Sequence, residues 1–228
     1  ACEELVTLKM PEIKTRFNFL TVGMLTDQSP DADRKNIYNT IRIFCENFKN
    51  NKEVGLVVKT SLGKYSSFDR KKTNEYFRKI IDYARGKNEF PKVYLLHGSM
   101  SKKDKINAYL TLTRGEGYGL PLIEAAASGL PIIATNHSGH LEFLKKDSFL
   151  GVDYVMVEVP KKKTDNRIFI EGTKWAEPDK ESCFTKMNEA YYNYESCKQI
   201  AEDYSIYIRS NYSKDSVKKM YDNTFKDV

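Results

Sequence analysis

Long apolar segments are missing from this sequence. No run of about 18 apolar residues occurs, and the first residues lack the apolar core of a secretion signal, so we expect no membrane-spanning helix. Cysteine is also scarce. The four cysteines in 228 residues share no Cys-x-x-Cys spacing, which predicts neither a disulfide framework nor a zinc site. We therefore expect a reduced, cytoplasmic protein.

A large excess of one charge is absent as well. The 37 basic and 31 acidic residues leave a net charge of +6, mixed along the chain. This balance favours a phosphate-bearing small molecule over a nucleic acid as the partner. The hydrophobic content of 40%, with 12% aromatic residues, is enough for a folded core and excludes wholesale disorder.

Short apolar runs alternate with amphipathic segments along the first two thirds of the chain. The amphipathic segments predict helices at 33–50, with Asp33 as N-cap, and at 69–86, closed by Gly86. Such alternation predicts an α/β, Rossmann-like fold, a mostly parallel sheet with helices on both faces. The predicted strands are 17–23, 54–60, 92–98, 108–113 and 130–135.

The two ends of the chain follow other patterns. Residues 1–15 are polar and predict a lead-in linker, which leaves 16–228 as one domain. Towards the C-terminus, VDYVMVEV and RIFIEG predict two added strands. The crossover before Ala108 is shorter than the dozen or so residues that usually join parallel strands. Three polar helices are expected at about 179–194, 195–210 and 213–227.

The most informative segment is RGEGYGLPLIEAAASGLPIIAT, residues 114–135. Its glycines alternate, but Leu120 stands where a dinucleotide fingerprint needs Gly or Ala, and no Gly-Lys-Ser/Thr follows. Neither a nicotinamide or flavin site nor a Walker loop is therefore predicted. Pro121 and Gly129 instead define a short helix. The positive N-terminal end of that helix suits a diphosphate.

Two glutamates, Glu116 and Glu124, flank this predicted phosphate site. A carboxylate beside a phosphate is repulsive unless it binds neutral groups, and ionised carboxylates bind the vicinal hydroxyls of a ribose or hexose well. The pair would reach groups on both sides of one diphosphate, which describes a nucleotide-sugar. The alternative is a solvated loop glutamate and a helix glutamate that only favours the dipole.

The segment resembles the E-x7-E motif of the large family of retaining glycosyltransferases that includes glycogen synthases and bacterial mannosyltransferases. The resemblance covers about residues 17–195. It implies the C-terminal, nucleotide-sugar-binding half of a GT-B fold, in which two Rossmann-like domains face each other across a cleft. The N-terminal, acceptor-binding half would lie outside this chain, which starts at Ala1. Further segments that resemble the family are FLTVG, RKN, LVVKT, NHSGHLEFL and WAEPD.

The resemblance also implies roles for individual residues. Glu116 would bind the transferred sugar and stabilise its oxocarbenium-like transition state, and Glu124 would bind the ribose hydroxyls. Lys35 and Arg34 would neutralise the departing phosphate, whereas the family more often carries an arginine at the position of Met24. The other expected donor contacts are Gly23, Lys59, Gly98, Ser99, Met100, Gly117, Tyr118, Gly119 and Leu120.

The implied donor is a UDP- or GDP-sugar, with neither a metal nor another cofactor, and the acceptor is unknown. Asp31 and Asp33 have a D-x-D spacing, but Asp33 serves better as a helix cap, and His137 and His140 lack a third metal ligand. Two other functions stay open: a nucleotide-sugar epimerase of GT-B fold, and a non-catalytic module that binds a nucleotide-sugar or nucleic acid. In the family the last helix crosses onto the N-terminal domain, so part of 213–227 is expected to pack there.

Overall fold

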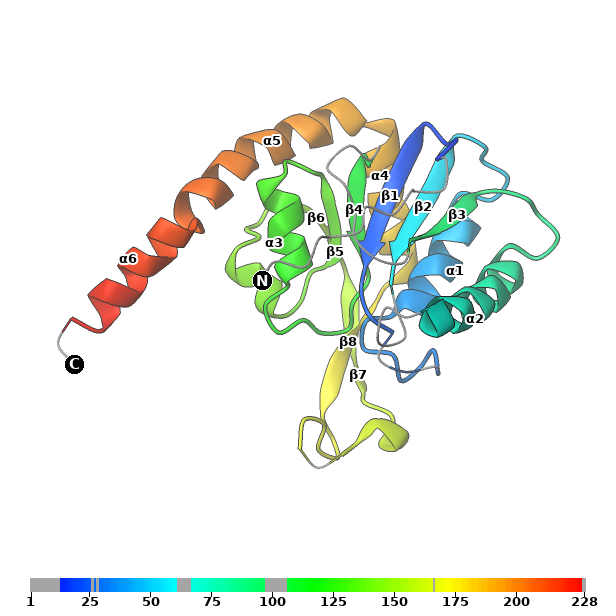
Figure 1. Ribbon diagram of the computed structural model, residues 1–228, viewed down its shortest axis with the longest axis horizontal. Helices are drawn as coiled ribbons and strands as arrows, with labels where there is room; N and C mark the ends of the chain where they lie inside the picture. The colour runs from blue at the N-terminus through cyan, green and yellow to red at the C-terminus, as the bar shows by residue number, and fades with distance from the viewer. Residues whose placement is uncertain are drawn as a thin grey trace.

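The computed structural model describes residues 13–25, 27, 29–60, 67–96, 106–165 and 167–226. Within these residues, six strands form a central sheet in the order β3-β2-β1-β4-β5-β6 (Figure 1). All neighbouring strands are parallel, as in a doubly wound Rossmann sheet, which confirms the predicted fold class. The strands are β1 (Phe17–Val22), β2 (Val54–Lys59), β3 (Lys92–Leu96), β4 (Ala108–Thr111), β5 (Ile132–Thr135) and β6 (Leu150–Val152).

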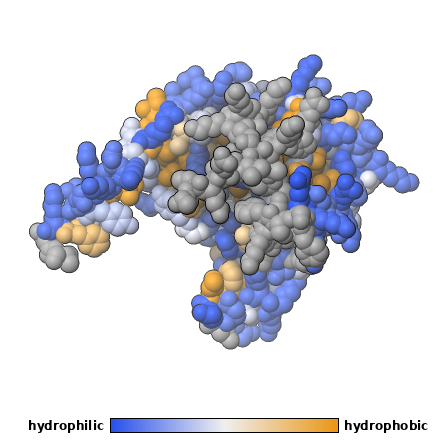
Figure 2. Space-filling model, viewed as in Figure 1, coloured by the Kyte–Doolittle hydropathy of each residue, from blue (hydrophilic) through white to orange (hydrophobic). Residues whose placement is uncertain are grey.

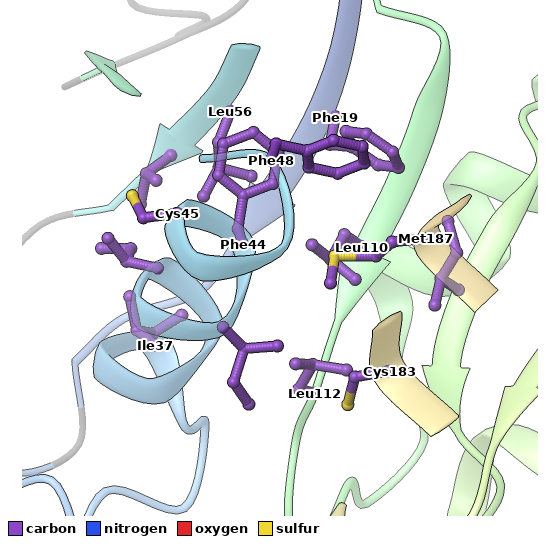
Figure 3. Close-up of a cluster of buried hydrophobic side chains, with 14 of the residues drawn as sticks. Phe19, Ile37, Phe44, Cys45, Phe48, Leu56, Leu110, Leu112, Cys183 and Met187 are labelled. Carbon is purple, nitrogen blue, oxygen red and sulfur yellow. The ribbon is translucent and has the colours of Figure 1, made fainter. Parts of the chain in front are cut away.

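Helices cover both faces of the sheet, because consecutive residues of the strands are apolar and point to opposite sides, so both faces need to be buried. In β2, Leu56 and Val58 belong to one buried cluster and Val57 to the other. The first cluster lies under α1 (Ile37–Asn47), α2 (Ser67–Arg85) and α4 (Lys180–Tyr192), and Figure 3 shows its centre. The second lies under α3 (Leu120–Ala127) and α5 (Tyr194–Asn211).

The first predicted helix starts later than expected. Asn36 has a left-handed φ of 56°, so α1 begins at Ile37 and the prediction of a helix from Asp33 is wrong in its start. The N-cap is Asn36 and not the predicted Asp33, although the Asp33 carboxylate still stabilises the helix start, because its Oδ2 accepts the N–H of Ile37 at 2.8 Å. The later boundary brings residues 34 and 35 into a turn instead of a helix.

The prediction that RIFIEG forms a strand is also wrong. Asp165 Oδ1 accepts the N–H groups of Arg167, Ile168 and Phe169 at 2.8–3.0 Å and folds this stretch into a turn. The strand that pairs with β7 (Tyr154–Glu158) is instead β8 (Lys174–Pro178), in antiparallel register. A 3-10 helix at Lys161–Lys163 lies in the connection between them.

Two elements project from the sheet (Figure 1). The hairpin of β7 and β8 leaves the carboxyl ends of the strands, and α6 (Lys214–Thr224) continues the direction of α5 away from the body. Every residue of α6 is at least partly exposed. Figure 2 shows apolar side chains on both projections. By exposed fraction, the large apolar side chains of the hairpin, of α6 and of the residue after α6 that are at least 44% exposed are Val155, Met156, Ile168, Ile170, Met220, Tyr221 and Phe225.

Candidate donor site

The predicted site lies at the carboxyl edge of the sheet, between β1 and β4. From β1 the chain adds strands in one direction, to β2 and β3, and from β4 it adds them in the other, to β5 and β6. Loops that leave adjacent strands in opposite directions open a crevice at this topological switch point, where α/β proteins bind their ligands. The loop after β1 carries Arg34 and Lys35, and the loop after β4 carries Glu116.

The turn after β1 directs Lys35 towards β4. Asp33 Oδ1 accepts the N–H of Lys35 at 3.2 Å, and the side-chain amide of Asn36 donates to the carbonyl of Leu112 at 2.9 Å. Gly23 directly follows β1, and its N–H donates to the carbonyl of Lys59 at 3.1 Å. A Cβ atom at residue 23 would lie 3.8 Å from Cγ and Cδ of Lys35. Gly23 therefore lies beside the lysine that the sequence predicts to bind phosphate.

Lys35 and Glu116, which the sequence places 81 residues apart, form a close ion pair. The distance from Lys35 Nζ to Glu116 Oε2 is 2.5 Å, and the two side chains are only 17% and 12% exposed. Such a shielded pair is weakly screened by solvent. The guanidinium of Arg34 donates to the carbonyl of Gly115, the residue before Glu116. The structure thus brings all three predicted catalytic residues together.

The helix after the glycine loop has the predicted ends. Gly119 precedes it with a φ of 94°, Pro121 lies in its first turn, and the first intrahelical bonds run from Leu122 and Ile123 to the carbonyl of Gly119. At its other end Gly129 has a φ of 70° and completes a Schellman motif. The N-terminal end of α3 therefore lies directly after the Glu116 loop.

The remaining predicted contacts are distributed around this point. Glu124 is exposed one turn into α3, and Leu120 is 65% exposed at its start. The Tyr118 ring packs at 5.2 Å from that of Phe143. Lys59 ends β2, one strand from the switch point. Gly98, Ser99 and Met100, the expected base contacts, lie outside the described residues.

Arg114 is a site residue that the sequence reasoning missed. It immediately precedes the glycine loop and is 4% exposed. Its Nη1 donates to the carbonyls of Pro30 and Asp33, at 2.8 and 3.1 Å, and so joins the loop after β1 to the loop after β4. Its position directly before the Gly-Glu-Gly run was the available signal, since an arginine at the end of a buried strand needs several acceptors.

The histidines and the D-x-D pair have structural partners. His140 is fully buried and its Nε2 lies 2.9 Å from the carbonyl of Thr135, and burial lowers the pKa of this imidazole below its ordinary value. His137 packs against Tyr154, and Asp31 pairs with Lys162 at 2.8 Å. Within the described ranges, no three His, Cys, Asp or Glu side chains are grouped closely enough to hold a metal ion.

The helices of the described part of the chain include none with the length and apolarity needed to cross a lipid bilayer. This agrees with the expectation from the sequence, in which long apolar runs are missing.

Part of the sequence is similar to known proteins. Residues 92–184 match the sequence profile of the family described as "Glycosyl transferases group 1". Sucrose synthase 2 of Pisum sativum is 28% identical over 149 residues, which are 54% of this chain and 18% of that protein. Residues 92–184 include β4, the glycine loop and α3, but not the loop after β1 that carries Arg34 and Lys35.

Solved structures extend the likeness to nearly the whole chain. Anabaena Alr3699/HepE in complex with UDP-glucose has a TM-score of 0.60 at 11% identity, over 93% of this chain and 49% of that one. The C-terminal domain of the group 1 glycosyltransferase LpcC from Francisella tularensis has a TM-score of 0.55 at 16% identity, over 89% of both chains. The chain thus spans half or less of the Anabaena protein and of sucrose synthase. These likenesses establish an α/β, Rossmann-like fold of the kind that forms one half of a GT-B glycosyltransferase.

Proposed function

We propose that this chain is the donor-binding half of a glycosyltransferase that moves a sugar from a UDP- or GDP-sugar to an acceptor, with retention of configuration. The observation that carries the proposal is the Lys35–Glu116 pair, held at the switch point of the sheet beside the N-terminal end of α3. A fixed cation, a helix N-terminus and a carboxylate at one crevice are what a diphosphate with an attached sugar needs.

The cation and the helix act on the leaving group. As the glycosidic bond breaks, the nucleoside diphosphate gains negative charge, and fixed positive groups aimed at it lower the barrier. Lys35 supplies the charge, and the N–H groups of Tyr118, Gly119 and Leu120, at the start of α3, supply the helix dipole end. Glu116 binds hydroxyls of the transferred sugar and stabilises its oxocarbenium-like transition state. Glu124, one turn further along α3, binds the ribose.

The ion pair also suggests how the donor is accepted. Before a donor binds, Lys35 and Glu116 neutralise each other, at 2.5 Å between Nζ and Oε2. An arriving diphosphate takes a share of the lysine, and Glu116 exchanges part of that contact for sugar hydroxyls. The two groups are therefore held in place before the donor binds, which reduces the reorganisation that the reaction requires.

The acceptor site belongs to an upstream domain in this proposal. The chain spans only 49% of the Anabaena protein, and the LpcC likeness is to a C-terminal domain. The exposed apolar residues of α6 give that domain a surface to pack against. The chain of 228 residues alone should bind donor nucleotide but transfer sugar poorly, and robust transfer without an upstream half contradicts this division.

Isothermal titration with UDP, GDP, UDP-glucose and GDP-mannose tests the site. We expect saturable binding of one nucleotide class, weakened about tenfold or more by Glu124→Ala because two hydroxyl bonds to a carboxylate are lost. Glu75→Ala, on the exposed face of α2, is the matched control and should leave binding unchanged. Absence of binding by folded protein, or equal binding by the Glu124 variant, would sink the assignment.

A second measurement separates transfer from epimerisation. With the upstream half present, a transferase releases free nucleotide faster when an acceptor is supplied, because the acceptor completes the displacement. An epimerase changes the sugar without such dependence. Salt-dependent DNA binding in the absence of nucleotide affinity would instead indicate a nucleic-acid module.

A further inference from the structure

One short segment after β5 holds both backbone polar groups of Glu116. The Oγ of Ser138 accepts the N–H of Glu116 at 2.8 Å, and the N–H of Gly139 donates to the carbonyl of Glu116 at 3.0 Å. Ser138 and Gly139 lie in the loop that follows β5, and Ser138 is 22 residues beyond Glu116 in the sequence. The peptide of the proposed sugar-binding glutamate is therefore held from outside its own loop.

Ser138 makes its contact in a conformation that serine rarely adopts. Its φ is 85° and its ψ is −162°. This region is nearly restricted to glycine, because a Cβ atom there crowds the neighbouring peptide groups. Glycine would relieve the strain but would have no hydroxyl to place on the N–H of Glu116. Strained residues persist where the surrounding structure over-determines them, and they concentrate at functional sites.

The loop after β4 and the loop after β5 are in close contact at Gly139. A Cβ atom at Gly139 would lie 1.9 Å from the carbonyl oxygen of Gly117, so the position has no room for a side chain. From the other side, Thr113 Oγ1 and Arg34 both donate to the carbonyl of Gly115. The peptide groups before and after Glu116 thus have fixed partners, and its carboxylate has Lys35.

We propose that Ser138 is a positioning residue for Glu116, a role that rests on the function proposed above. Without the hydroxyl, the N–H of Glu116 loses its acceptor and the peptide can rotate, which displaces the carboxylate relative to the sugar. Transition-state contacts tolerate about 0.5 Å of error, and a misplacement of about 1 Å can cost about a hundredfold in rate. Donor affinity depends mainly on the diphosphate and ribose contacts, which Ser138 does not make. The loss should therefore fall on kcat and not on KM.

Ser138→Gly and Ser138→Ala separate this role from a purely structural one. Glycine removes the hydroxyl and relieves the backbone strain, so we expect a Tm equal to or above that of the wild type, with a kcat about 10- to 100-fold lower. Alanine removes the hydroxyl and keeps the strain, so it should lower both kcat and Tm. A residue that merely stabilises the fold would not lose rate while stability is kept.

The experiment uses the chain together with its upstream half and UDP-glucose or GDP-mannose, whichever the titration identifies, with sugar release to water or acceptor as the readout. Ser148→Ala, whose hydroxyl donates to the carbonyl of Lys145 away from the site, is the control and should match the wild type. A Ser138→Gly protein with wild-type kcat, or with KM raised in proportion to the loss of rate, overturns the positioning role. A wild-type protein that neither binds nor turns over donor overturns the proposed function itself.

Discussion

The guanidinium of Arg114 lies over the indole ring of Trp175, with Cζ 5.0 Å from the ring centroid. Its Nε donates to Glu177 Oε2 at 2.5 Å. Trp175 and Glu177 both belong to β8, so the side chain of Arg114 connects the projecting hairpin to the start of the glycine loop. The hairpin thereby becomes part of the frame that holds the candidate site, although it lies outside the central sheet.

Arg114→Met should be strongly destabilising. The change leaves the carboxylate of Glu177 and two backbone carbonyls without their donor, and we expect a loss of about 2–4 kcal/mol in the free energy of unfolding. Arg16→Met is the matched control, because its pair with Glu53 is 87% and 49% exposed, and such pairs contribute about 1 kcal/mol or less. Urea unfolding of both variants measures the difference. Equal losses would contradict the structural role of Arg114.

Lys35 and Glu116 should be energetically coupled. Lys35→Met and Glu116→Gln each leave the other member of a shielded pair without its partner. The losses in the free energy of unfolding of the two single variants should therefore add up to more than the loss in the double variant. A double-mutant cycle in urea should give a coupling energy of about 0.5–3 kcal/mol. Additive effects would show that the pair contributes nothing in solution. In an activity assay Lys35→Met should also lower the rate by about 10²- to 10³-fold.

Phe44 belongs to the first buried cluster and is 0% exposed, and its ring lies 5.8 Å from that of Phe19 and 5.2 Å from that of Phe48 (Figure 3). Phe44→Ala should cost about 3–5 kcal/mol, because burial and close packing are both lost. Tyr83→Ala, on α2, is the control, since this side chain is 72% exposed and should change stability little. Thermal or chemical denaturation checks both values. Comparable losses would argue against the cluster as the core.

His140 should make the fold sensitive to acid. Desolvation by burial is the largest cause and lowers its pKa below the ordinary 6.5. The carbonyl of Thr135 and then Glu116 oppose this shift, whereas His137 and Lys35 add to it. The unfolded chain then binds a proton that the folded chain excludes, so stability falls as the pH drops below about 6.5. His140→Asn removes this contribution. Its free energy of unfolding should change less between pH 7.5 and 5.5, by up to about 1.4 kcal/mol per pH unit. If the free energy of unfolding of the wild type and of the His140→Asn protein changes equally with pH, the role of His140 is refuted.

Chelation should not impair donor binding. The proposed site neutralises the diphosphate with Lys35 and a helix N-terminus instead of a metal ion. Titration of UDP or GDP in excess EDTA should therefore match titration in Mg²⁺. A donor affinity that falls on chelation and returns with Mg²⁺ would assign the charge compensation to a cation.

Much of the fold follows from local patterns that the sequence displays. The buried runs of β1, β2 and β4 are short, apolar and bounded by turn residues, and the Pro-to-Gly helix α3 has chemical signals at both ends. The two failures have separate causes: the left-handed φ of Asn36 delays the start of α1, and a local side-chain hydrogen-bond acceptor prevents the RIFIEG strand. RIFIEG has strand propensity, but Asp165 captures its first three N–H groups.

Glu116 and Lys35 could be proposed as site residues because they stand in segments that resemble a known family, and the structure brings their side chains into contact. The site was not predictable where the contact depends on which loops meet. Arg114 and Ser138 act on residues that lie 63 and 22 positions away, in Glu177 and Glu116, and a single sequence carries no record of those pairings. The strained φ of Ser138 is likewise a product of the assembled loops, since nothing in HSGH predicts which residue takes it.

The hairpin of β7 and β8 could be deleted without breaking the path of the chain, because its two ends already meet. The N–H of Asp179 donates to the carbonyl of Asp153 at 2.7 Å, so a short turn could replace everything between them. The obstacle is Arg114, which would be left as a buried cation without Glu177 or Trp175. Loss of the hairpin in evolution should therefore require a simultaneous change at residue 114, and the two features should be inherited together.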